Sequence, residues 1–279
     1  SWKMSLSDSS KENQMTNSKS LTPRSGSGWH RGFAPIARRE VRRWLSPRRG
    51  LVHLILWTGL LGGALALALF VIPNAMPEEE AMSLADTLEA GYQFFFGLGA
   101  IATSIGAIVV LQDALIEDKT VGTIELVLSK PLSRTAYVLG RLVPNLAAFL
   151  ATMIIIPGVV GYLLFSIVEP GYSGFDFARG VSLLALHVFF YANLSIMLGT
   201  LLKARGPYLG VALGVLLGGT LVPVGAIVRF TPWKLSDLAI MAAAGMPAPP
   251  DAPIMVASTL VWSAVFVAVA LRRMQRAEL

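Results

Sequence analysis

Long runs of apolar residues, separated by short polar segments, dominate the chain from residue 51 onward. A helix that rises about 1.5 Å per residue crosses the hydrocarbon core of a bilayer with about 20 residues, and every run is long enough. Backbone groups in a bilayer must hydrogen-bond internally, so short connections favour a helical bundle over a β-barrel. The pattern predicts an all-α membrane protein with six transmembrane helices in residues 50–273. The six runs are residues 51–73, 91–111, 137–168, 177–202, 207–229 and 253–271.

A segment with helical spacing of its apolar residues comes just before the first run. In "FAPIARREVRRWLSP", residues 33–47, apolar side chains fall on one side of a helix and arginines on the other. This arrangement is typical of a helix in the lipid headgroup region, so we predict an amphipathic interfacial helix over residues 31–49. The alternative is an amphipathic helix packed on a soluble domain, but the sequence offers no such domain. The residues expected at the membrane interface are Trp44, Arg38, Arg39, Arg42 and Arg43.

Composition supports a membrane protein and removes several chemistries. The chain is 54% hydrophobic and 14% charged, with a mean hydropathy of +0.62. Soluble domains carry about 25% charged residues. Cysteine is absent, which excludes disulfides, thiolate metal sites and cysteine nucleophiles. Residues 1–30 are polar, and we expect a disordered tail there. No signal peptide is visible, because the first apolar run begins only at Leu51.

The distribution of basic residues predicts the orientation in the membrane. If the N-terminus is cytoplasmic, 20 of the 23 Lys and Arg residues lie on the cytoplasmic side of the six predicted spans. This asymmetry places both termini inside, with residues 274–279 as a cytoplasmic tail. The first outer loop, "NAMPEEEAMSLADTLEA", has five acidic residues and no basic one. Because the positive charge flanks the membrane spans, the net charge of +6 does not lead us to expect a nucleic-acid partner.

Residues 230–252 form an unusual outer segment. Its stretch "LSDLAIMAAAGM" is apolar but too short to cross a bilayer, and the following "PAPP" blocks further helix. We expect re-entrant or surface helices here.

Motifs for nucleotide or metal chemistry are missing from this sequence. A P-loop requires a Gly-Lys pair, and this dipeptide occurs nowhere, so the chain does not bind ATP by that route. The three histidines lie far apart in sequence and do not suggest a metal site. His187 and Ser195 are eight residues apart, too far to touch on one straight helix. The sequence therefore argues against an intramembrane enzyme, and the lack of charged pairs deep in the spans argues against an ion-coupled carrier.

The fifth apolar run contains glycines at strict four-residue spacing. Such spacing leaves a smooth groove along one helix face, where another backbone approaches closely. Two readings stay open at this point, a subunit interface and close packing within one bundle. The glycines are Gly206, Gly210, Gly214 and Gly218.

Residues 113–136, between the second and third runs, form the longest predicted cytoplasmic link. Asp113 to Lys119 can extend the second helix beyond the membrane, and Gly122 with Thr123 can break it. The following "TIELVLSKP" predicts a short amphipathic helix whose apolar side chains need a partner to cover them. The whole run "EDKTVGTIELVLSKPLSRTAYVLGRL" resembles the first cytoplasmic loop of type 2 ABC transporter permeases.

The resemblance implies a type 2 ABC exporter fold with an N-terminal elbow helix before six spans. It implies that the 113–136 loop forms a coupling helix seated on one of two separate ATPase subunits, which bind ATP and Mg. No cofactor is then expected in this chain itself, and no catalytic residue. The residues expected at the ATPase contacts are Glu117, Gly122, Thr123, Glu125, Lys130 and Arg134, with Lys203 and Arg205 in a shorter second contact.

The resemblance also implies a second permease subunit, identical or different, and a place in a prokaryotic plasma (inner) membrane among lipids. We therefore expect the membrane subunit of an ATP-driven exporter. The alternative is the same fold acting as a mechanotransmitter, which passes ATPase motion to an extracytoplasmic partner without translocation. The short outer loops favour transport.

Overall fold

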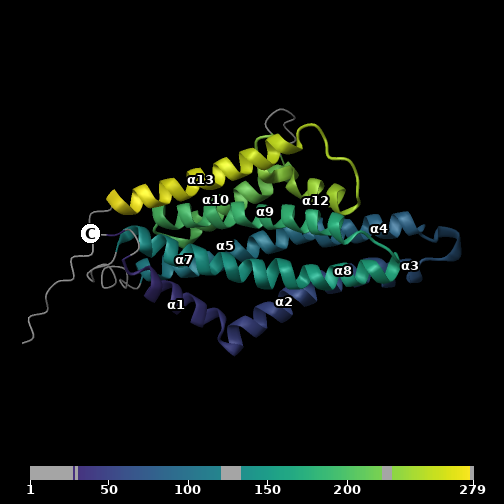
Figure 1. The fold of residues 1–279 in the computed structure, drawn as a ribbon, viewed down its shortest axis with the longest axis horizontal. Coiled ribbons are helices and arrows are strands. Elements are labelled where there is room, and N and C mark those ends of the chain that lie inside the picture. Colours follow the sequence, from purple (N-terminus) through teal and green to yellow (C-terminus); the bar gives the residue numbers. More distant parts are fainter. Residues whose placement is uncertain (1–27, 29–30, 121–132, 222–227, 277–279) are drawn as a thin grey trace, which may run out of the picture.

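A computed structural model describes the chain except for residues 1–27, 29–30, 121–132, 222–227 and 277–279. Every regular element in the described residues is a helix (Figure 1). The α-helices are α1 (Phe33–Trp44), α2 (Pro47–Ala66), α3 (Ile72–Ala75), α4 (Leu84–Tyr92), α5 (Gly99–Thr120), α7 (Arg134–Phe149), α8 (Ile156–Val168), α9 (Gly174–Leu201), α10 (Arg205–Leu221), α12 (Leu235–Ala243) and α13 (Ala252–Arg276).

Five of the six predicted spans correspond to helices that are long and apolar enough to cross a membrane. They are Pro47–Ala75, Leu84–Gln112, Arg134–Val168, Gly174–Leu201 and Ala252–Arg276. The fifth predicted span, residues 207–229, is covered by α10 only as far as Leu221, because residues 222–227 lie outside the description. That sixth transmembrane helix therefore stays a prediction.

A π-helical turn interrupts each of the first three spans. These turns are Leu67–Val71, Gln93–Leu98 and Leu150–Ile155. Two of them directly precede an α-helix with proline near its start, Pro73 in α3 and Pro157 in α8. Proline cannot donate the usual backbone hydrogen bond, and a π turn is one way in which a helix continues past such a break.

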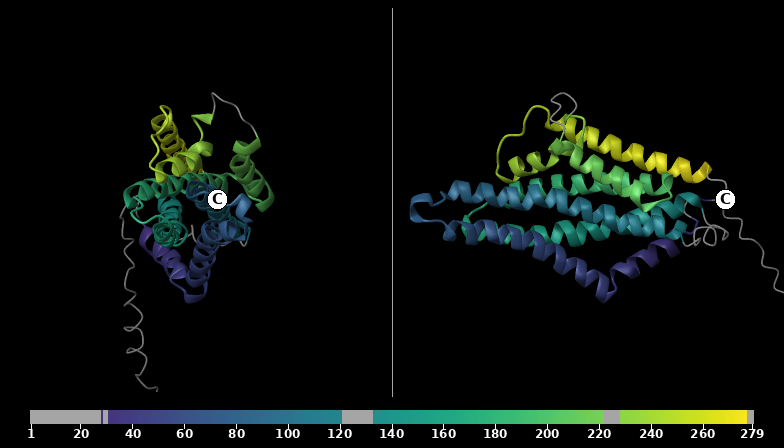
Figure 2. Two further views of the ribbon diagram at one scale, coloured as in Figure 1. Left: turned by 90° about the vertical axis from the view of Figure 1, so that its right-hand side faces the viewer. Right: turned by 180° about the vertical axis from the view of Figure 1, so that it is seen from behind.

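Helix α9 lies at the centre of the bundle. It packs against α5, α12 and α13, and its buried side chains include Leu184, Tyr191 and Ile196. The end-on view in Figure 2 places α1 and α2 at one margin of the bundle and α13 at the opposite margin. Helices α1 and α2 meet in an open V that projects from the bundle (Figures 1 and 2).

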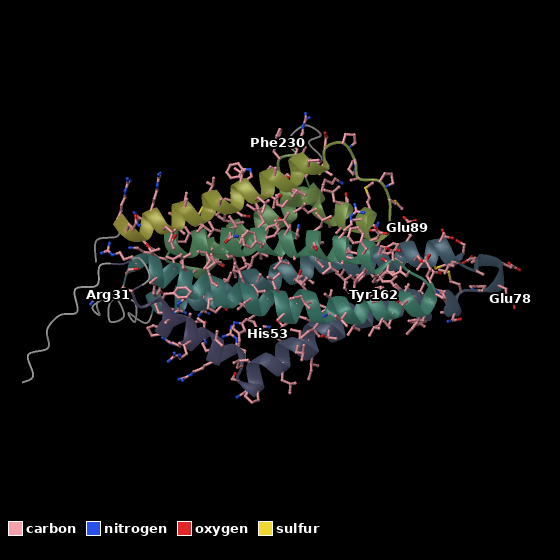
Figure 3. The ribbon with its side chains drawn as sticks, in the orientation of Figure 1. Arg31, His53, Glu78, Glu89, Tyr162 and Phe230 are labelled. Carbon is pink, nitrogen blue, oxygen red and sulfur yellow. The ribbon has the colours of Figure 1, made fainter. Side chains whose placement is uncertain are left out.

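The two ends of the bundle differ in charge. Figure 3 shows Arg31 at the end where α13 finishes, and Glu78 and Glu89 at the other end. We call the first of these the basic end, because it also carries the exposed side chains of Arg272, Arg273 and Arg276. Both α1 and α13 therefore bring positive charge to one end of the molecule, as the predicted topology requires. Which end faces the cytoplasm stays a prediction.

Helix α12 belongs to the predicted outer segment 230–252 and packs closely on α9. The hydroxyl of Tyr172, in the turn before α9, donates a 2.7 Å hydrogen bond to the carbonyl oxygen of Ala243. Burial raises the pKa of Tyr172, so the hydroxyl stays protonated and available as a donor. A nine-residue helix is too short to cross a bilayer. Its packing on α9 is consistent with the expected re-entrant or surface helix and does not decide between the two.

Gly180 sets the distance between α9 and α12, which provides a test of this packing. A Cβ atom at Gly180 would lie 2.7 Å from the carbonyl oxygen of Ala239 and 2.8 Å from the Cβ of Ala243. We expect Gly180→Ala to lower the free energy of unfolding by about 1–3 kcal/mol, measured by denaturation in mild detergent. Gly63→Ala is the matched control, because no atom of the described residues lies within 4 Å of a Cβ placed there. Equal stability of the two variants would contradict this packing.

Candidate functional site

The helix that leads into the predicted coupling segment extends as the sequence suggested. Helix α5 continues through Thr120, which confirms the predicted helix over Asp113 to Lys119, while its position beyond the membrane stays a prediction. Glu117 lies in its last turns, although the side chain is outside the described part. The other predicted ATPase-contact residues before Arg134 lie outside the described residues altogether. They are Gly122, Thr123, Glu125 and Lys130.

Description resumes at the far end of the segment, where two residues connect three parts of the chain. Ser133 caps α7, since its hydroxyl accepts a 2.9 Å hydrogen bond from the backbone N–H of Ala136. The backbone N–H of Ser133 donates at 2.9 Å to the carbonyl oxygen of Arg31, just before α1. Arg134 then donates through Nη1 to the carbonyl oxygens of Met274, at 3.2 Å, and Gln275, at 2.8 Å.

These bonds of Arg134 satisfy a physical need of α13. The last carbonyl groups of a helix have no partner within the helix and carry partial negative charge, so a guanidinium is a favourable donor there. Arg134, predicted as an ATPase contact, therefore has internal partners as well. The return point of the segment is bonded directly to the end of the last described helix.

A buried ion pair joins α1 to α7 about two turns further along α7. Arg141 Nη1 lies 3.0 Å from Glu40 Oε1, and the two side chains are only 3% and 1% exposed. Arg43 lies 3.8 Å from the other carboxylate oxygen. Gly140 has no Cβ atom, which lets the two helices approach closely. A Cβ at this position would lie only 3.0 Å from the side chain of Ile36. Charges buried this deeply persist only when they are paired.

Trp44 extends the contact between α1 and α7. Its indole Nε1 donates a 2.8 Å hydrogen bond to Asn145 Oδ1, and Asn145 Nδ2 donates at 2.7 Å to the Arg141 carbonyl oxygen. The ring also meets Phe149 edge-on, at 5.7 Å between centroids. The expectation that Trp44 contacts the membrane interface is corrected here, because α7 covers the indole and leaves it 6% exposed. Part of the apolar face of α1 therefore packs on protein.

Glu40 was missed in the reading of the sequence, although a signal was present. It is the one acidic residue of α1, and it lies four residues from both Ile36 and Trp44 on the same helix face. An acid on the apolar face of a basic helix needs a buried basic partner. The four predicted interface arginines differ in exposure. Arg38, Arg39 and Arg42 are exposed, and Arg43 is half-buried.

The predicted second contact lies between α9 and α10, also at the basic end. Lys203 is exposed in the turn and Arg205, likewise exposed, begins α10. Tyr208 fixes the next turn, because its hydroxyl donates a 3.0 Å hydrogen bond to the carbonyl oxygen of Ile108 in α5. The covered face of α10 then continues through Ala212 and Leu216.

The opposite face of α10 carries the regularly spaced glycines. Gly206, Gly210 and Gly214 are exposed, and no atom of the described residues lies within 4 Å of a Cβ placed on any of them. At Gly218 a Cβ would lie 3.3 Å from the ring of Trp233. Of the two open readings, packing within the bundle therefore applies at Gly218 and not at the other three.

The histidine and serine weighed as catalytic candidates are both buried in α9. His187 Nδ1 lies 3.3 Å from the carbonyl oxygen of Pro232, whereas the hydroxyl of Ser195 makes no hydrogen bond within the described residues. Among all the residues that the structure describes, no group of three His, Asp or Glu side chains is placed to hold a metal ion.

The Glu40–Arg141 pair can be tested by a double-mutant cycle. We expect Arg141→Met to lower the free energy of unfolding by about 3–5 kcal/mol, because the buried Glu40 carboxylate would keep only the more distant Arg43, at 3.8 Å, as a partner. The double variant Glu40→Leu/Arg141→Met should recover most of this loss, because it buries no charge. Denaturation in mild detergent measures both. Losses that simply add in the double variant would show that the two residues are not coupled.

A comparison with known protein families gives a match that spans the whole bundle. The family model described as ABC-2 family transporter protein matches residues 34–279, which include all helices from α1 to α13 apart from the first residue of α1. A comparison with curated proteins found no match. The family match agrees with an all-helical fold that has several candidate membrane spans. The chain therefore belongs to the ABC-2 transporter family, and it is a membrane permease component of an ABC transporter.

Proposed function

We propose that the chain is the membrane-spanning subunit of an ATP-driven exporter, in which residues 113–136 receive motion from a partner ATPase. One observation carries the proposal. The segment returns to the bundle at Ser133 and Arg134, and these two residues are bonded to the start of α1 and the end of α13. A displacement of the segment would therefore act on three elements together.

The contacts beyond Arg134 explain how such a displacement would spread. The buried Glu40–Arg141 pair and the Trp44–Asn145 hydrogen bond fix α1 to α7 over the next turns. Helix α13 also packs along α9, the central helix. Closely packed helices move as units rather than deforming continuously. We infer that α1, α7 and the end of α13 form one moving body.

The same proposal assigns ATP and Mg to the partner chains. The sequence has no P-loop, and ABC-2 permeases work with ABC ATPase subunits. Two ATPase subunits per complex would receive Glu117, Gly122, Thr123, Glu125, Lys130 and Arg134 in one contact and Lys203 with Arg205 in another. The basic end would then face the cytoplasm of a prokaryotic cell, with both termini on that side.

A second permease subunit would pack on the glycine face of α10. Gly206, Gly210 and Gly214 lie open, and the neighbouring apolar side chains of Val211 and Leu217 are 46% and 42% exposed. Small residues at four-residue spacing let two helix backbones approach closely within a membrane. The face fits a second copy of this chain or a related permease.

The contact with the ATPase can be tested by removing charge from the coupling segment. Co-expression with its cognate ABC ATPase should yield a complex that co-purifies and hydrolyses ATP. We expect Glu117→Gln/Glu125→Gln to lower ATPase activity in the complex at least fivefold while the melting temperature of the permease stays the same. The control is Glu78→Gln/Glu79→Gln, at the opposite end, which should preserve activity.

Several results would count against this proposal. Equal activity of the two double variants would exclude the segment as the ATPase contact. Transport into liposomes by the chain alone, without ATP, would exclude an ATP-driven mechanism. ATPase coupling that persists without translocation of any tested solute, but changes the binding of an extracytoplasmic protein, would instead support the mechanotransmitter.

The proposed subunit interface has its own test. Gly210→Leu/Gly214→Leu should fill the open face of α10 and lower the dimer fraction of purified chain in mild detergent about tenfold, as measured by mass photometry. Gly59→Leu/Gly63→Leu makes the same change on α2, where a Cβ at either position has no neighbour within 4 Å in the part of the chain that the structure describes. A dimer fraction unaffected by the α10 change would place the second subunit elsewhere.

A further inference from the structure

An open groove of about 720 Å³ lies on α1 at its bend into α2. We call it the arginine groove, because five of its seven lining residues are arginines. The lining residues are Pro35, Arg38, Arg39, Arg42, Arg43, Ser46 and Arg49. In Figure 3 nitrogen-tipped side chains project from α1 on the side away from the bundle.

Three of the five groove arginines have no ion-pair partner among the described carboxylates. No carboxylate lines the groove, and none of the described carboxylates forms an ion pair with Arg38, Arg39 or Arg42. The one acid of α1, Glu40, is turned inward and is engaged by Arg141 at 3.0 Å. Gathering like charges in one groove is unfavourable unless an anion binds there.

The groove is held in shape by the contacts behind it. Arg49 lies over the Trp44 ring, 4.8 Å from its centroid, and the Trp44 indole is bonded to Asn145 of α7. The hydroxyl of Ser46 donates a 2.8 Å hydrogen bond to the Arg43 carbonyl oxygen, which fixes the bend. The groove is therefore part of the folded bundle, and the contact of α1 with α7 fixes the position of the backbone that carries the arginines.

The neighbouring apolar side chains indicate the depth of the groove in a membrane. Val41 and Leu45 of α1 are 43% and 76% exposed next to the arginines. Immediately after the groove, α2 begins a candidate span and exposes Leu51, Val52 and Ile55. A helix with exposed Leu beside exposed Arg fits the boundary between headgroups and acyl chains, where both are satisfied.

We propose that the arginine groove binds the headgroup of an anionic glycerophospholipid, and that it prefers a lipid with two phosphodiester groups in one headgroup. Guanidinium groups bind phosphate oxygens with two parallel hydrogen bonds, which an ammonium cannot reproduce. A single phosphodiester offers one negative charge to Arg38, Arg39 and Arg42, whereas a headgroup with two phosphodiesters offers two negative charges in one molecule. The acyl chains would lie along Val41, Leu45 and the exposed face of α2.

Bound lipid would give α1 a second fixed contact. One face of α1 is attached to α7 through Glu40 and Trp44, and the other would be attached to the headgroup layer. This inference does not depend on the ATPase proposal, because it concerns lipid binding by the permease chain alone.

The test measures lipid binding to the full purified chain in detergent by native mass spectrometry. The probes are tetraoleoyl cardiolipin, dioleoyl phosphatidylglycerol and dioleoyl phosphatidylcholine. We expect cardiolipin to bind at least tenfold more tightly than phosphatidylglycerol. Arg38→Gln/Arg39→Gln/Arg42→Gln should weaken cardiolipin binding on the order of a hundredfold, since each basic residue contributes roughly fivefold near an anionic lipid surface.

Two further variants separate a built site from general attraction. Arg272→Gln/Arg273→Gln/Arg276→Gln removes the same charge from exposed positions of α13 at the same end, and should change cardiolipin affinity less than threefold. Arg38→Lys/Arg39→Lys/Arg42→Lys retains the charge and should lose most of the preference for cardiolipin over phosphatidylglycerol. Melting temperatures of all three variants confirm that each one folds.

The following outcomes would overturn the proposal. Equal weakening by the α1 and α13 glutamine variants would mean diffuse attraction. Displacement of cardiolipin by inorganic pyrophosphate at equal concentration would mean a site for soluble phosphates. Unchanged lipid binding in the α1 variants, together with loss of the ATPase from the complex, would make the groove a protein contact.

Discussion

The buried pair of Glu40 and Arg141 is the constraint on which the arrangement of the basic end depends. Neither side chain can reach water, so each stabilises the other only while α1 stays on α7. The pair fixes the rotation of α1, which turns Ile36 and Trp44 toward the bundle and the remaining arginines outward. An apolar contact of the same size would tolerate sliding, whereas a buried ion pair favours one register.

This fixed register connects features that are distant in sequence. The start of α1, the start of α7 and the end of α13 meet around Ser133 and Arg134, although they lie about a hundred residues or more apart along the chain. The predicted ATPase contact therefore enters the bundle where three parts of the chain are hydrogen-bonded to one another. The glycine face of α10 lies outside this junction, so the proposed subunit contact and the proposed coupling contact use different parts of the molecule.

Much of this architecture could be read from the sequence, because a bilayer imposes a simple rule on length and polarity. Apolar runs located five candidate spans, and helical spacing located α1. The same pattern could not show whether lipid or protein covers the apolar face of α1. Trp44 was therefore assigned to lipid, although α7 covers it. Glu40 was missed for the same reason, since its partner Arg141 is a hundred residues away. The four glycines looked alike in sequence, and only the position of Trp233 distinguishes Gly218 from the rest.

The π-helical turns in the first three spans have a consequence for how these spans are compared and mutated. A π turn accommodates one more residue than an α turn of the same helix, so the periodicity of the sequence shifts by one position as it passes Leu150–Ile155. The side chains that line one side of the span therefore do not follow a single 3.6-residue repeat from α7 through to α8. When this chain is aligned with a relative that lacks the π turn, the relative needs a one-residue gap inside the span. Deleting one residue from Leu150–Ile155 would turn the π turn into a regular α turn and keep the helical phase of α7 and α8 on either side.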